Sequence, residues 1–195
     1  MTEKIDDQEL QTSTTPGYNP GEKKTLDEYA QLDSNDESLN KWKASLGIGA
    51  GAANENGPKI EFISLSLESA TRLEPIVFNF AELEGKKEHI KKNPVSIKEG
   101  TEYNVKLDFK VNHDVISGLR YVQVVKRTGM TVDKMEEMVG SYGPSQNPYE
   151  KRFATEESPS GMLARGTYSV RSRIVDDDGH IYVDFDWAFK ISKEW

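Results

Sequence analysis

The chain has 195 residues and a mass of 22.0 kDa, which is enough for one domain and a tail. Its 25 Lys and Arg residues against 33 Asp and Glu residues give a formal charge of −8, which argues against a general nucleic-acid binder. Cysteine is absent, which excludes disulfides, thiol nucleophiles and cysteine-ligated zinc. With no apolar run long enough for a bilayer and an acidic, polar start, the sequence predicts a cytoplasmic protein without stable membrane insertion.

Residues 1–57 form a polar segment that we interpret as a flexible regulatory arm. Residues 1–24 show no apolar period and are expected to be disordered. A helical hairpin is expected over about residues 25–46, because Ser/Thr-x-x-Glu capping boxes begin at Thr25 and Ser34.

The second expected helix has an apolar face made by Leu39, Trp42 and Leu46. Helices of two or three turns are unstable alone in water. This face therefore either docks on its own domain or folds onto a partner, and the sequence leaves both open. The glycines and alanines of residues 47–57 predict a flexible linker.

From residue 58 onward the apolar period changes to two, which is typical of strands with one buried face. The predicted strands cover residues 60–68, 76–80, 103–111, 119–126, 149–153, 167–175 and 181–191. The segment 133–139 is expected to form a helical turn. Short strands separated by turn signals predict an all-β, immunoglobulin-like antiparallel β-sandwich over residues 58–195.

The inward faces of these strands carry many aromatic residues. They supply more bulk than two close-packed sheets about 10 Å apart need. Either the sandwich is simply well filled, or its sheets splay around an apolar cavity. Periodicity alone does not decide between the two.

Catalytic and metal chemistry have little support in the sequence. The three histidines are scattered without metal-ligand spacing, and no nucleophile lies in a known catalytic motif, so neither an enzyme nor a cofactor is expected. Two acidic groups, Glu156 with Glu157 and the run 176–178, are expected to be solvated. If the fold brings them to one rim, they could attract a basic partner segment.

Several stretches together resemble the Rho GDP-dissociation inhibitor family. They are LDSNDESLNKWKASLG, GLRYVQVVKRTG, VGSYGP, SPSGMLARGTYSVRSRIVDDD and FDWAFKI. The resemblance runs from about Tyr18 to Trp195. It implies a mobile arm with a helical hairpin, followed by an immunoglobulin-like sandwich with an isoprenoid pocket. The implied partner is a prenylated, GDP-bound Rho-type GTPase, held as a 1:1 heterodimer, whose nucleotide release is blocked and which is drawn off membranes.

The resemblance also assigns roles to individual residues. The GTPase switch region would be contacted by Asp36, Ser38, Leu39 and Trp42. The geranylgeranyl group would be bound by Leu67, Val95, Tyr103, Val115, Leu163, Val170, Phe185 and Trp187. The basic tail before the prenylated cysteine would meet Glu156, Glu157, Asp177 and Asp178, and Glu137 would lie near the pocket mouth.

A second hypothesis is a carrier of other lipidated proteins with a similar sandwich, whose binding would be indifferent to residues 1–57. A third is a plain immunoglobulin-like scaffold with a filled core. The absence of cysteine and of a signal peptide disfavours an extracellular version of the third.

Overall fold

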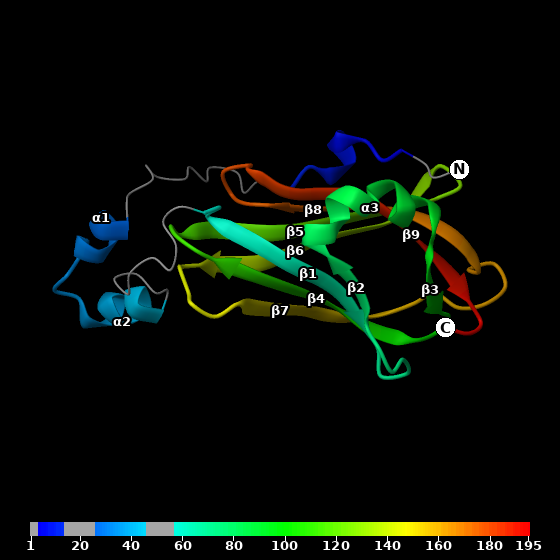
Figure 1. Cartoon of the computed structure of the whole chain (residues 1–195), viewed down its shortest axis with the longest axis horizontal. Helices are drawn as coiled ribbons and strands as arrows, with labels where there is room; N and C mark the ends of the chain where they lie inside the picture. The colour runs from blue at the N-terminus through cyan, green and yellow to red at the C-terminus, as the bar shows by residue number, and fades with distance from the viewer. Residues whose placement is uncertain (1–3, 14–25, 46–56) are drawn as a thin grey trace.

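The computed structural model describes residues 4–13, 26–45 and 57–195, and its body consists of two β-sheets packed face to face (Figure 1). One sheet has four strands in the order β2-β1-β4-β7, and the other has five in the order β3-β9-β8-β5-β6. The helical elements are η1 (Asp7–Leu10), α1 (Leu26–Gln31), α2 (Glu37–Ser45) and α3 (Phe80–Lys92). The strands are β1 (Ile60–Glu68), β2 (Ile76–Asn79), β3 (Val95–Lys98), β4 (Glu102–Val111), β5 (Ile116–Arg127), β6 (Met130–Tyr142), β7 (Tyr149–Glu157), β8 (Gly166–Val175) and β9 (Ile181–Ser192).

The predicted sandwich is confirmed, and the alternation that predicted it has the expected cause. In β4, Leu107, Phe109 and Val111 are fully buried, whereas the residues between them are partly exposed. Their side chains point into the space between the sheets, where burial of apolar surface provides the main stabilisation. The strand pairs are antiparallel except for β3 with β9, which run parallel.

The segment 133–139 forms part of strand β6, so the prediction of a helical turn there is wrong. Strand β6 pairs with β5 along most of its length and has no second strand partner in the described sheets, which makes it an edge strand. Backbone hydrogen bonds to β5 determine its conformation, and such tertiary pairing overrides weak local preferences.

Helix α3 and strand β3 are elements that the sequence analysis did not predict. Asn79 caps α3, because its side-chain oxygen accepts a hydrogen bond from the backbone N–H of Ala81 at 3.0 Å. The helix crosses from the edge of one sheet to the edge of the other and buries Leu83 against the core (Figure 1). It therefore covers the side of the sandwich between β2 and β3.

Residues 4–13 lie on the outer face of the five-stranded sheet, which corrects the expectation of disorder for this part of the chain. Ile5 and Leu10 are each only 1% exposed and form a small cluster with Val122, Val124 and Val175. Two apolar residues separated by polar ones leave no periodic signal, and their partners lie more than 100 residues away in sequence. We call residues 4–13 the N-terminal strap.

Helices α1 and α2 form the expected hairpin, but a different residue caps the second helix. Asp36 accepts hydrogen bonds from the backbone N–H groups of Ser38 and Leu39, at 2.9 and 3.1 Å, whereas Ser34 lies in the preceding turn. The ammonium of Lys43 donates to the carbonyl of Leu32 and so joins the two helices. Thr25, Leu46 and most of the expected linker lie outside the described residues. No helix in the described ranges is long and apolar enough to cross a membrane.

Candidate functional site

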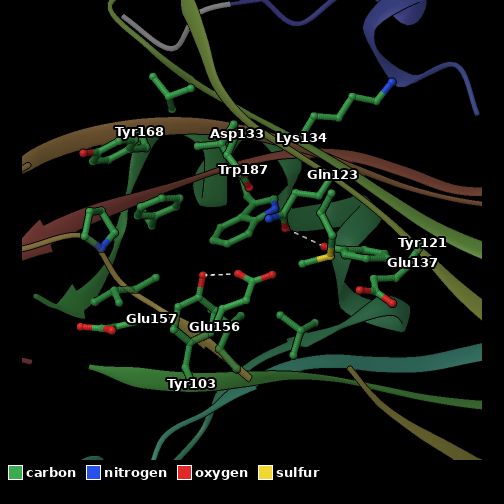
Figure 2. A pocket seen from close by; sticks show the side chains of 18 of the residues that line it. Tyr103, Tyr121, Gln123, Asp133, Lys134, Glu137, Glu156, Glu157, Tyr168 and Trp187 are labelled. Atoms are coloured by element: carbon green, nitrogen blue, oxygen red, sulfur yellow. Dashed lines mark hydrogen bonds between the residues drawn. The ribbon is translucent and has the colours of Figure 1, made fainter. Parts of the chain in front are cut away.

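A cavity of about 750 Å³ opens between the two sheets, at the end of the sandwich where β4 begins and β5 ends. This volume lies within the range of small-molecule and lipid sites. Its walls combine apolar side chains from both sheets with polar groups, mostly acidic, from β6 and β7 (Figure 2). The apolar part of the wall includes Leu65, Leu67, Ile97, Val105, Val125, Met135, Trp187 and Phe189.

The side of the cavity formed by the five-stranded sheet contains a buried and connected polar network. The indole N–H of Trp187 donates to Ser172 Oγ at 3.0 Å, and Ser172 Oγ lies 2.9 Å from the hydroxyl of Tyr121. That hydroxyl also donates to Gln123 Oε1 at 2.7 Å. Because each buried polar group has a partner, the network fixes the orientation of the Trp187 and Tyr121 rings without an energetic penalty for unmet hydrogen bonds.

One partly buried hydrogen bond lies in the cavity wall, between side chains of the paired strands β4 and β7. The hydroxyl of Tyr103 donates to a carboxylate oxygen of Glu156 at 2.6 Å, in front of Trp187 (Figure 2). Burial raises the pKa of Glu156 above its usual value, and the nearby charges of Asp133 and Glu137 raise it further. The cavity mouth therefore concentrates negative charge beside an apolar floor.

Arg127 holds the loop between β7 and β8 against the same end of the cavity. Its guanidinium lies over the ring of Tyr168, 4.9 Å from the ring centre, and donates to the Tyr168 hydroxyl at 3.0 Å. It also donates to the backbone carbonyls of Leu163 and Arg165. These three hydrogen bonds, the contact with the Tyr168 ring and the ion pair between Arg165 and Glu99 at 2.7 Å support the loop.

Some of the residues expected in the isoprenoid pocket do line this cavity. Leu67, Tyr103 and Trp187 contribute to its walls, as do Glu156 and Glu157 from the expected basic-tail contact. Glu137, expected near the pocket mouth, is also in the wall.

Five other residues of that expected set do not line this cavity, and their contact with an isoprenoid stays a prediction. Val170 pairs directly with Val125 and Trp187 and so points to the same inner face, but it is fully buried and does not reach the cavity wall. Phe185 packs against Phe78 and Phe80 on the side covered by α3.

The remaining three lie in other parts of the fold. Val115 is in the turn between β4 and β5, at the far end of the sandwich. Val95 belongs to β3 but does not line the cavity, whereas Ile97, two residues further along the same strand, does. Leu163 is 92% exposed in the β7–β8 loop.

The two acidic pairs do not form one rim. Glu156 lies beside Tyr103 at the beginning of β4, whereas the backbone N–H of Asp177 donates to Ser117, past the end of the same strand. Ten residues of extended strand separate these positions, a distance of about 30 Å. Asp177 is paired with Arg120 at 3.0 Å at its own end. The expected common acidic surface is therefore corrected to Glu156 and Glu157 with their β6 neighbours.

The sequence analysis missed the contribution of β6 to the site. Asp133, Met135 and Glu137 pair in register with the inward residues of β5 and line the cavity. Two of these three inward side chains are acidic, so no apolar period of two marks the strand in the sequence. Tyr121 and Gln123 were also missed, because Val122 and Val124 beside them are apolar and the sequence does not show which set of residues points inward.

On the hairpin, all four residues expected to contact a GTPase are at least partly exposed. Trp42 is 56% exposed, Ser38 is exposed and Leu39 is half-buried. Asp36 caps α2 and is also exposed. An exposed tryptophan and a half-buried leucine on one short helix form an apolar face that the described part of the chain covers only in part.

Comparison of the sequence with known proteins finds one family of regulatory binding proteins. The family model "RHO protein GDP dissociation inhibitor" matches residues 3–194. The Rho GDP-dissociation inhibitor of Schizosaccharomyces pombe is 46% identical over 182 residues, covering 92% of this chain and 88% of the relative. Rho GDP-dissociation inhibitor 1 of Homo sapiens is 41% identical over 179 residues, covering 91% and 86%.

Among solved structures, a Niemann-Pick type C2 protein from the Japanese carpenter ant aligns with a TM-score of 0.43 at 10% identity. That alignment covers 73% of this chain and 99% of the other.

The fold and the cavity define a β-sandwich protein with a candidate binding site between its two sheets. The chain belongs to the Rho GDP-dissociation inhibitor family, as the extent of the family match and the identity to its members show.

Proposed function

We propose that this protein binds prenylated, GDP-bound Rho-type GTPases one to one, blocks their nucleotide release and extracts them from membranes into the cytoplasm. The observation that carries the proposal is the cavity of about 750 Å³ with its apolar floor, which is suited to the isoprenoid, a geranylgeranyl group. Family membership supplies the class of partner.

The carboxylates at the cavity mouth suit the chemistry of a basic tail. Asp133, Glu137, Glu156 and Glu157 lie in the cavity wall. A basic segment entering beside the lipid would relieve the repulsion that raises the pKa of Glu156. The same segment is attracted by anionic lipids, so these carboxylates compete with the membrane surface for it.

The lipid pocket alone does not account for extraction. Burying an isoprenoid is worth about 0.8 kcal/mol per CH₂, but a bilayer buries it equally well. Net removal therefore needs contacts that only the protein provides. We assign these to the carboxylates and to the helical hairpin, where Asp36, Ser38, Leu39 and Trp42 would engage the GTPase switch region.

The alternative, a carrier of other lipidated proteins, would use the cavity alone. The exposed Trp42 and half-buried Leu39 favour the first proposal, because a carrier that ignored the hairpin would have no use for this apolar face. Two results together would support the carrier. Only changes in the cavity would weaken binding of a lipidated peptide, and changes in the hairpin would leave binding of whole GTPases unaltered.

The experiment is a titration with a fluorescent geranylgeranylated peptide bearing a basic tail. Val125 lines the cavity and is only 5% exposed, so Val125→Trp places an indole in the lipid site and should weaken binding by at least about tenfold. Val77→Trp is the matched control, since Val77 is 53% exposed on β2, outside the cavity wall. Thermal melting shows whether each variant is folded. A folded Val125→Trp variant that binds as the parent does would rule out this cavity as the lipid site.

A further inference from the structure

The N-terminal strap bonds to two different parts of the five-stranded sheet. Its first half lies over β8, where Asp7 Oδ1 contacts Arg171 at 2.8 Å and Arg173 at 2.5 Å. The guanidinium of Arg171 also donates to the carbonyl of Ile5 at 2.8 Å. Ile5 is 1% exposed, so this half is anchored by both charge and burial.

The second half of the strap reaches the edge strand β6. Glu9 accepts a hydrogen bond from the Thr131 hydroxyl at 2.7 Å, and the carbonyl of Gln11 accepts one from Lys134 at 3.0 Å. The hydroxyl of Ser13 donates to Glu136 at 2.9 Å, and its backbone N–H donates to the same carboxylate at 3.1 Å. The strap thus bonds side chains of β6 at three places along the strand.

These contacts are made on the outer side of β6, through side chains of which Lys134 and Glu136 also border the cavity. Along β6, Asp133, Met135 and Glu137 pair with inward residues of β5, whereas Lys134 and Glu136 alternate with them. Figure 2 shows Lys134 extending away from the cavity. The strand that supplies the inward acidic wall is therefore held on its outer side by the strap.

Strand β6 needs such support more than its neighbours do. It is hydrogen-bonded to another strand along one side only, and its register with β5 shifts at three points. An edge strand with an interrupted ladder has fewer backbone bonds to fix its position. Charge complementarity adds to the fit, because Glu9 forms an ion pair with Lys126 of β5 at 2.6 Å.

We propose that the strap positions β6 for ligand binding, so that residues 9–13 act through Thr131, Lys134 and Glu136 on the shape of the cavity. This inference rests on the proposed function, because it concerns the affinity of the same site. A strand already held in place loses less conformational freedom when a ligand packs against it, which favours binding. Ser13 and Glu9 are then positioning residues for the lipid site, although neither lines it.

The test compares changes at the two halves of the strap in the full-length chain. Glu9→Ala with Ser13→Ala removes the side-chain bonds that these two residues make to β6, whereas Asp7→Ala removes those to β8. Gln8→Ala, at an exposed strap position, is the neutral control. Hydrogen–deuterium exchange is measured for the strap, β6 and β7, and affinity is measured with the geranylgeranylated peptide.

We expect the double variant to raise exchange in β6 but not in β7, and to weaken peptide binding by about fivefold. Asp7→Ala should leave both quantities within about twofold of the parent. If the double variant does not increase exchange in residues 9–13, Leu10→Asp is used to detach the strap, since it places a charge at a fully buried position.

A detached strap with unchanged β6 exchange and unchanged affinity would overturn the inference, as would equal effects from Asp7→Ala. Failure of the parent protein to bind the peptide would instead refute the proposed function. In that case the exchange of β6 still decides whether the strap positions the strand.

Discussion

Glu156 places a partly buried carboxylate in the cavity wall, where an ordinary protein interior has an apolar side chain. Its carboxylate is partly buried beside an apolar floor and accepts a hydrogen bond from Tyr103. Burial raises its pKa above the ordinary value of 4.5, and the hydrogen bond from Tyr103 offsets this only in part. A raised pKa in the folded state means that the ionised form is disfavoured by folding, so this carboxylate lowers stability at neutral pH.

We therefore predict that Glu156→Gln increases the free energy of unfolding at pH 7. Glutamine keeps an oxygen that can accept the bond from Tyr103, but it carries no charge to desolvate. The gain should shrink as the pH falls below the raised pKa of Glu156, because protonation then removes the same charge from the parent protein. Chemical denaturation from pH 7 to pH 4 measures this.

Glu157→Gln is the matched control for that series, because Glu157 is exposed and the change removes the same formal charge. It should alter stability little at any pH. An unfolding free energy for Glu156→Gln that is equal to or below that of the parent at pH 7 would contradict the assignment of a desolvation cost to this carboxylate.

At the scale of single elements, helix α2 shows how one side chain can serve both structure and function. Asp36 accepts two backbone hydrogen bonds at the start of the helix and is also one of the residues that we assign to the GTPase contact. Replacement by alanine would remove both contributions at once. The two can be separated with a side chain that caps without a charge.

We predict that Asp36→Ala lowers the helicity of the hairpin, with a loss of about 1 kcal/mol in helix stability, and weakens GTPase binding. Asp36→Asn should keep the helicity, because asparagine caps as well as aspartate, while still weakening binding through loss of the charge. Circular dichroism and a GTPase binding titration measure the two effects. If both variants bind as the parent does, Asp36 is a cap and nothing more.

The strands that could be predicted are those with one face in a filled core. In β4 the inward positions are apolar and the outward ones polar, so the local sequence carries the whole signal. Strand β6 breaks that rule because its inward Asp133 and Glu137 face a cavity rather than packed side chains. The position where sequence patterning failed is therefore part of the candidate site.

The N-terminal strap and α3 were missed for a different reason. Only two strap residues, Ile5 and Leu10, are buried, and the surface that buries them is formed by strands far along the chain. Helix α3 has few apolar residues, and Leu83 is its one fully buried hydrophobic residue among those described. Elements held by a few long-range contacts leave too weak a local period to be recognised.

For the whole molecule, the sandwich separates the proposed tasks in space. The proposed lipid cavity lies at the end of the sandwich where β4 begins, whereas the ion pair of Asp177 with Arg120 lies at the opposite end of the sandwich. In Figure 1 the hairpin of α1 and α2 lies beyond the end at which β1 begins. A GTPase that engaged both the hairpin and the cavity would therefore contact two well-separated parts of one chain, and each contact would raise the effective concentration of the other.

The measurement that tests this account most directly is release of a geranylgeranylated, GDP-loaded Rho-type GTPase from liposomes, followed by sedimentation. The parent protein should move the GTPase into the supernatant. Val125→Trp should abolish release by filling the cavity. The pair Leu39→Ala and Trp42→Ala should also abolish it, while leaving binding of the geranylgeranylated peptide unchanged. Release by Val125→Trp equal to that of the parent, or no release by the parent itself, would contradict the account.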